Sequence, residues 1–227
     1  MSGAEIRSEP LQPSRDCPLC PRLAAFRELW REREPTWHNA PVPNFGPVDA
    51  PVLIVGLAPG LRGANRTGRP FTADFAGDLL FPTLKKFGFA VGEYRRDPAD
   101  GFELRGAAIS NAVRCVPPQN KPLPAEIRTC RMFLDSEIAA RPSLQAIVAL
   151  GRIAHESTLR ALDLKPSAFP FAHAAIHDCG RFRLYDTYHS SRQNVNTHTL
   201  TPAMFEAVFA RLRQDLDGAS RLPWGEG

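Results

Sequence analysis

The chain has 227 residues, 43% of them hydrophobic, which is enough to bury a substantial core within one domain. Lys and Arg number 28 against 24 Asp and Glu, a small excess that permits a polyanionic partner without requiring one. No run approaches the ~18 apolar residues of a membrane span, and the N-terminus has no apolar segment typical of a secretory signal. These features exclude a membrane protein and predict a cytoplasmic one.

The two ends of the chain differ in composition from its centre. Residues 1–14 are polar and contain two prolines, which predicts a flexible arm, and residues 218–227 are expected to form a tail. Between them, residues 15–217 are expected to form a single domain. Its first element is a helix over 22–33, where Leu, Phe and Trp recur at helical spacing, followed by a proline-rich loop over 35–47.

Short apolar runs and helical patterns alternate through the rest of the chain. The runs, which predict strands, cover 51–57, 106–113, 144–150 and 182–188. Helices are predicted over 78–87, 125–140, 153–162 and 202–216. Such alternation indicates an α/β fold with a mostly parallel sheet covered on both faces. In such sheets ligands bind beyond the carboxyl ends of the strands. The functional site is therefore expected in the loops 56–74, 111–122 and 188–201.

Four cysteines have spacings typical of a metal site. Cys17 and Cys20 form a C-x2-C pair, while Cys115 and Cys130 follow the second predicted strand. Four thiolates could hold either a [4Fe-4S] cluster or a structural zinc ion, and spacing alone does not separate the two. Unrelated buried thiols are the remaining alternative. Cys179 has no cysteine nearby in the sequence and is not expected to be a ligand.

The strand-end loops contain four motifs, GLAPG, GRPFTAD, NAVRCVPPQNKP and HSSRQN, in this order. Together with the four cysteines they resemble the type b (family 5) uracil-DNA glycosylases, from about Cys17 to Phe209. The resemblance implies a three-layer α/β/α sandwich around a four-stranded, mostly parallel sheet. It also implies an iron-sulfur cluster held by Cys17, Cys20, Cys115 and Cys130. The expected protein is a monomeric DNA-repair enzyme that acts on double-stranded DNA and is associated with the nucleoid.

The implied reaction is the hydrolysis of the bond between uracil and its sugar, after the base has been flipped out of the duplex. By resemblance, Phe71 stacks on the flipped base, Asn111 hydrogen-bonds its edge, and His189 donates a hydrogen bond to a uracil oxygen. An ordinary core role for Phe71 and a turn-capping role for Asn111 are the alternatives. The backbone of Gly56, Leu57 and Ala58 is expected to line the base pocket.

The GLAPG motif departs from related glycosylase families, which have an acidic or amide residue at the position of Leu57. Asp74 is the best substitute for that water-activating group, since it lies in the same loop after the strand. Its alternative role is to cap a helix that begins at FAGDLLF. Asn120 is expected to help hold the water. Without a polar side chain at Leu57, the pocket is expected to accept other deaminated bases, such as hypoxanthine or xanthine.

Two segments are expected to contact DNA. The first is the loop that follows His189 and would enter the minor groove, comprising Ser190, Ser191, Arg192, Gln193 and Asn194. The second includes Lys121, which is expected to bind phosphate and not to form a Schiff base with the sugar. Hydrolysis without strand cleavage, a monofunctional reaction, is therefore predicted. The alternative is a non-catalytic nucleic-acid-binding module that is stabilised by a bound metal.

Overall fold

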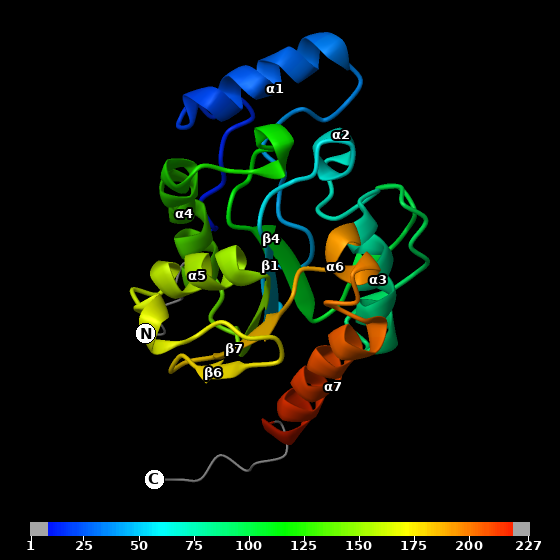
Figure 1. Ribbon diagram of the computed structural model, residues 1–227, viewed down its shortest axis with the longest axis vertical. Helices are drawn as coiled ribbons and strands as arrows, with labels where there is room; N and C mark the ends of the chain where they lie inside the picture. Colours follow the sequence, from blue (N-terminus) through cyan, green and yellow to red (C-terminus); the bar gives the residue numbers. More distant parts are fainter. Residues whose placement is uncertain (1–8, 220–227) are drawn as a thin grey trace, which may run out of the picture.

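The structure is a computed structural model that describes residues 9–219 (Figure 1). The outer parts of the predicted arm and tail, 1–8 and 220–227, lie outside the described residues. Within the described part of the arm, the backbone N–H of Leu11 donates to Ser136 Oγ at 2.7 Å. Gln12 Oε1 accepts a hydrogen bond from Arg114 at 2.9 Å. Residues 11–12 are thus attached to the domain, although their sequence predicts a flexible arm.

The central sheet has five strands in the order β4-β1-β5-β7-β6. The first four are parallel and lie within the predicted runs: β4 (Ala107–Asn111), β1 (Val52–Gly56), β5 (Ala146–Leu150) and β7 (Arg183–Thr187). The predicted four-stranded parallel core is therefore confirmed. The edge strand β6 (Ile176–Asp178) pairs antiparallel with β7. It was not predicted, because three residues that include a His and an Asp form no apolar run.

Helices cover both faces of the sheet, as Figure 1 shows. One face packs against α4 (Pro124–Ala139) and α5 (Arg152–Ala161), and the other against α3 (Phe75–Lys86) and α7 (Pro202–Ala219). With α1 (Pro21–Arg33), these are the five predicted helices, and the layers confirm the three-layer α/β/α sandwich. Among the described residues, no helix combines the length and the apolar character needed to cross a membrane.

Several short elements were not predicted, because each has too few residues to show a period. They are α2 (Ala64–Thr67), α6 (Arg192–Asn196), the 3-10 turns Pro118–Asn120 and Pro166–Ala168, and the small hairpin of β2 (Ala90–Val91) and β3 (Glu103–Leu104). Of these, α2, the turn Pro118–Asn120 and α6 follow β1, β4 and β7, and they therefore shape the loops at the carboxyl edge of the sheet.

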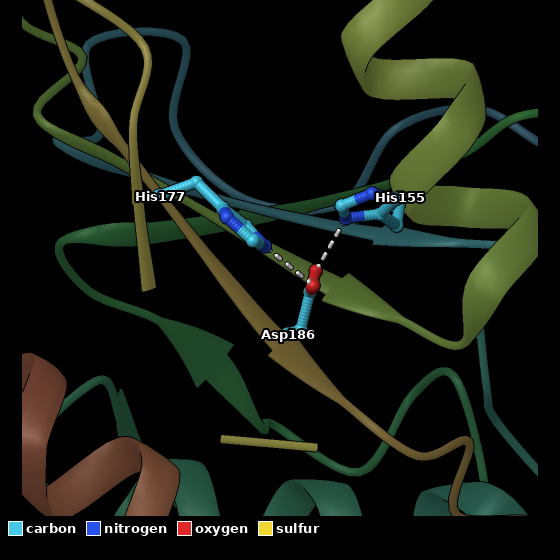
Figure 2. A group of neighbouring side chains, drawn as sticks. All are labelled: His155, His177 and Asp186. Carbon is cyan, nitrogen blue, oxygen red and sulfur yellow. Dashed lines mark hydrogen bonds and ion pairs between the residues drawn. The ribbon is translucent and has the colours of Figure 1, made fainter. Parts of the chain in front are cut away.

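A buried polar cluster joins α5, β6 and β7 behind this edge (Figure 2). Asp186 Oδ1 lies 2.8 Å from His155 Nδ1, and Asp186 Oδ2 lies 3.0 Å from His177 Nε2. His155 Nε2 is 2.8 Å from the carbonyl oxygen of Phe169. Both nitrogens of His155 therefore lie within hydrogen-bond distance of oxygen atoms. We interpret the group as a buried hydrogen-bonded network that fixes α5 to the sheet.

Replacing Asp186 by Asn is expected to lower the free energy of unfolding by about 2 kcal/mol, because the amide has a single oxygen acceptor and leaves one of the two histidines without its partner. Urea unfolding of the two proteins measures this difference. Asp178→Asn is the matched control, since Asp178 is exposed on β6 and accepts one local hydrogen bond from Gly180 N–H at 2.9 Å. A loss for Asp186→Asn no greater than that of the control would contradict the stabilising role of this network.

Candidate active site

A pocket of about 560 Å³ opens at the carboxyl edge of the parallel strands. Its walls come from the three strand-end loops in which the sequence predicts the functional site. The lining residues predicted from the sequence are Leu57, Ala58, Phe71, Asp74, Asn111, Asn120, His189, Ser191, Arg192 and Gln193. Pro59, Gly60, Phe75 and Ala76 also line it and were not predicted, although they adjoin predicted residues in the same loops.

Gly56 shapes the floor of the pocket without lining it. It is paired with Asn111 across β1 and β4. A Cβ atom on Gly56 would lie 2.6 Å from Phe71 Cζ and overlap Asn111 Oδ1, so only glycine allows both side chains to approach the strand. Asn111 is 3% exposed, and its Oδ1 has no hydrogen-bond partner within the described chain. An unpartnered amide at the pocket floor is suited to hydrogen-bonding a ligand rather than capping a turn.

Phe71 and His189 face this pocket from different loops. Their ring centroids are 6.3 Å apart and the planes are inclined by 32°. Phe71 has a φ of 58°, which is unusual for a residue with a bulky side chain. Phe71 also belongs to the buried cluster that packs against α3. The core role and the pocket role are therefore compatible, because one ring serves both.

Burial lowers the pKa of His189 to about 4, since the imidazolium form would lose its hydration. The imidazole is therefore neutral at physiological pH. Within the described residues no side-chain hydrogen bond of His189 is present, while its carbonyl oxygen accepts from Asn194 Nδ2 at 2.8 Å. A neutral ring with one free N–H can donate to a ligand oxygen without bringing a full positive charge.

We expect His189→Ala to reduce the single-turnover rate by about 10²-fold while weakening DNA binding much less. The reason is that a hydrogen bond to a leaving base strengthens as negative charge develops on it. Single-turnover kinetics across a range of enzyme concentrations separates the rate from the affinity. Equal losses in both would mean that His189 only binds the base.

Asp74 occupies the position before α3, but its carboxylate makes no hydrogen bond to that helix. Oδ2 instead accepts from the N–H of Ala64, the first residue of α2, at 3.3 Å. The alternative role as an α3 cap is therefore wrong. A Cβ on Gly60 would lie 2.5 Å from Asp74 Oδ1, and one on Gly63 would overlap the carboxylate. The GLRG segment thus needs glycines because it passes directly over Asp74.

Burial also raises the pKa of Asp74, and the N–H of Ala64 opposes this shift only in part. A carboxylate with a raised pKa is a stronger proton acceptor than one exposed on the surface. Asp74 lines the same pocket as His189. The site therefore combines His189, which can stabilise a growing negative charge, with Asp74, which can accept a proton from water or stabilise a positive charge.

The loop predicted to enter the minor groove is partly a short helix, α6. Ser191 caps it, its Oγ accepting from Asn194 N–H at 3.3 Å. Arg192 is exposed and stacks over Phe75, with 5.3 Å from its Cζ to the ring centroid. The prediction that Ser190 contacts DNA is wrong, because Ser190 is 0% exposed and its hydroxyl donates to the carbonyl of Ala76 at 3.2 Å. It fixes the loop to α3 and has no surface to offer DNA.

Asn120 and Lys121 lie in an exposed turn on the other side of the pocket. Asn120 reaches the pocket, whereas Lys121 does not line it. This turn is held from α1, where Arg22 donates to the Lys121 carbonyl at 3.1 Å and pairs with Glu126 at 2.7 Å. Lys121 is thus exposed and lies outside the pocket lining.

The four predicted cysteine ligands converge between α1, the segment after β4, and α4. They line one small cavity and pack in one cluster with Leu23, Val113 and Phe133. Cys130 Sγ accepts from the N–H of Arg114 at 3.3 Å, and Cys115 Sγ from Arg27 Nη1 at 3.8 Å. Hydrogen bonds of this kind suit thiolate sulfur. Cys179 packs in a different cluster, so the prediction that it is not a ligand agrees with its position.

Burial raises the pKa of Cys115 to about 11 and that of Cys130 to about 12. As free thiols they would stay protonated at neutral pH, whereas a metal centre would bind them as thiolates. The donor set is therefore compatible with a metal centre.

Comparisons with known proteins agree with this geometry. The family model described as the uracil DNA glycosylase superfamily matches residues 43–213. A type-5 uracil-DNA glycosylase of Thermus thermophilus is 44% identical over 205 residues, covering 87% of this chain and 93% of the relative. Another from Pyrobaculum aerophilum is 38% identical, covering 88% and 89%. A type-4 uracil-DNA glycosylase of Pyrobaculum aerophilum is 30% identical over 149 residues, which cover 65% of this chain and 62% of the relative.

The matched region includes all four strand-end motifs, the three pocket loops and the central sheet. Both type-5 relatives also cover most of the chain. The chain therefore belongs to the uracil-DNA glycosylase superfamily and, within it, to the type-5 uracil-DNA glycosylases.

Proposed function

We propose that the protein excises uracil from double-stranded DNA by hydrolysing the N-glycosidic bond and leaving an abasic site. The observation that carries this proposal is the single pocket in which Phe71, Asn111, His189 and Asp74 meet. Each supplies one requirement of the reaction: an aromatic face, a base-edge reader, a donor for the leaving base and a carboxylate for the water or the sugar.

The reaction separates charge between the two products of bond cleavage. As the bond to the sugar lengthens, the sugar becomes positive and the uracil becomes an anion. The N–H of His189 stabilises the uracil oxygen, while Asn111 holds the base edge. Asp74 offsets the positive sugar and accepts a proton from the attacking water. The neighbouring Asn120 helps hold that water at the rim of the pocket.

DNA is expected to lie across the rim of the pocket. Arg192 and Gln193 are exposed there on α6, and Lys121 is exposed on the opposite turn. Arg and Lys at such positions bind phosphates, and a short helix can occupy the space that the flipped base vacates. Ser191 and Asn194 support the loop from within. One flipped base needs one copy of the chain, so we propose a monomer that works on cytoplasmic, nucleoid DNA.

We further propose that Cys17, Cys20, Cys115 and Cys130 hold a [4Fe-4S] cluster. The convergence of the four thiols on one small cavity supports a metal centre there, and the resemblance to the type b uracil-DNA glycosylases favours the cluster over zinc. When bound, the cluster supplies structure and no step of the hydrolysis. It would join α1 to both ends of the segment that presents Asn120 and Lys121.

An end-labelled duplex with one uracil tests the proposal. We expect strand cleavage only after alkali treatment, because hydrolysis leaves an abasic site with an intact backbone. Borohydride added during the reaction should trap no covalent complex, since Lys121 does not reach the pocket. Tight binding without any abasic site would instead support the alternative of a non-catalytic nucleic-acid-binding module.

The same assay defines the range of bases. The pocket has the apolar Leu57 where related families have a polar residue, and its volume of about 560 Å³ exceeds that of a single pyrimidine. We therefore propose that hypoxanthine and xanthine also enter. Duplexes that contain either base should give alkali-sensitive sites. Activity on uracil alone would limit the proposal to that base.

A further inference from the structure

The loop that carries Phe71 and Asp74 adopts an unfavourable backbone conformation. Phe71 has a φ of 58° and Ala73 a φ of 61°, both in the left-handed region that favours glycine. Residues with a Cβ atom persist there only when surrounding contacts hold them, and such conformations cluster at functional sites. Ala73 directly precedes Asp74, so its backbone angles set the direction in which the Asp74 carboxylate leaves the chain.

The contacts that hold Ala73 come from the segment 92–102 between β2 and β3. Tyr94 Oη accepts a hydrogen bond from Ala73 N–H at 3.0 Å. Arg96 Nη2 donates to the Ala73 carbonyl at 3.4 Å. Both polar groups of this residue are therefore bound by side chains of one segment, and neither side chain lines the pocket.

The phenol of Tyr94 is itself held rigidly. Its ring packs against those of Phe81 and Phe102, with centroid distances of 4.5 and 6.1 Å. The segment is tied back to the start of the loop by Arg69, whose Nη1 and Nη2 donate to Asp100 at 2.8 and 2.9 Å. Arg69 Nε also donates to Thr72 Oγ1 at 2.6 Å. Residues on either side of Phe71 are thus bound to the same support.

We propose that Tyr94 is a positioning residue for the reaction. Its hydroxyl holds Ala73 in the left-handed conformation and thereby aims Asp74 into the pocket. This inference rests on the proposed function and extends it to a side chain outside the pocket. The sequence offers no signal for this role, because Tyr94 lies 20 residues beyond Asp74 in a segment without a regular pattern.

Tyr94→Phe tests the proposal, because it removes the hydroxyl and keeps the ring packing. We expect the single-turnover rate on a uracil duplex to fall about tenfold, the scale of one hydrogen bond, with the half-saturating enzyme concentration unchanged. Tyr185→Phe is the matched control. Its hydroxyl donates to Asp215 of α7 at 2.8 Å, and neither residue is among those that line the pocket.

A rate for Tyr94→Phe equal to that of the wild-type protein would overturn the proposal. So would a loss of affinity that accounts for the whole effect, or an equal loss of rate in Tyr185→Phe, which would indicate a general loss of stability. Thermal melting of both variants shows that each is folded at the assay temperature. Absence of base release by the wild-type protein would contradict the proposed function itself, whereas an active wild type with an unaffected variant contradicts only the role of Tyr94.

Discussion

Asp74→Asn is expected to lower the single-turnover rate of uracil release at least tenfold, and by as much as 10²- to 10⁴-fold if Asp74 is the general base. The amide keeps the shape of the carboxylate and can still accept a hydrogen bond from Ala64 N–H. It cannot take a proton from water or offset a positive sugar. Binding to a uracil duplex should stay nearly unchanged, because Asp74 is proposed to stabilise the transition state and not to bind the DNA backbone.

Asp178→Asn is the matched control for this change. Asp178 is exposed on β6 and accepts one local hydrogen bond from Gly180 N–H at 2.9 Å. Asp178 does not line the pocket. We expect the rate of the control variant to stay within about twofold of the wild-type value, a smaller effect than the loss of one hydrogen bond would cause. Unchanged kinetics in Asp74→Asn would remove Asp74 from the chemistry.

Cys20→Ala is expected to remove the metal centre and to lower the free energy of unfolding by several kcal/mol, since structural metal sites contribute on the order of 10 kcal/mol. For an iron-sulfur cluster, the anaerobically purified wild-type protein should absorb broadly near ~400 nm, and the variant should not. Iron analysis and thermal melting provide two independent measurements. The loss of stability should be accompanied by a loss of activity, because Asn120 and Lys121 lie between two of the proposed ligands, Cys115 and Cys130, in the sequence.

The fifth cysteine supplies the control for this experiment. Cys179 is half-buried like Cys20 but packs against the α4 and α5 face of the sheet, away from the four proposed ligands. Cys179→Ala should therefore keep both the absorbance and the iron. A colourless wild-type protein with one zinc ion per chain would contradict the cluster, while loss of iron in Cys179→Ala would contradict the choice of ligands.

The main features of the fold follow from patterns that are local in the sequence. The strands β1 and β5 are each a continuous apolar run, as strands buried on both faces require, whereas β4 ends in Ser110 and Asn111 and β7 contains Arg183 and Asp186. The topology then places three loops on one edge, which is why most of the predicted pocket residues meet. Strand β6 has no such pattern, since His177 and Asp178 occupy two of its three positions.

The details of the site depend on contacts between distant segments, which no local pattern records. Asp74 is spaced like a helix cap, yet its partner is Ala64 of another helix. Ser190 lies within a polar loop motif but turns inward to Ala76. The cluster of His155, His177 and Asp186 unites three separate elements, and the support from Tyr94 comes from a segment that lines no part of the pocket.

The most direct test of the account is to measure free uracil and abasic sites together after a single turnover on a uracil duplex with enzyme in excess. The proposed hydrolysis predicts that one uracil is released for each abasic site formed, with the strand intact until alkali is added. Bound duplex with no free uracil would contradict it and leave a binding protein in its place. Strand breaks that appear with the uracil, before alkali, would contradict the proposed hydrolysis without strand cleavage.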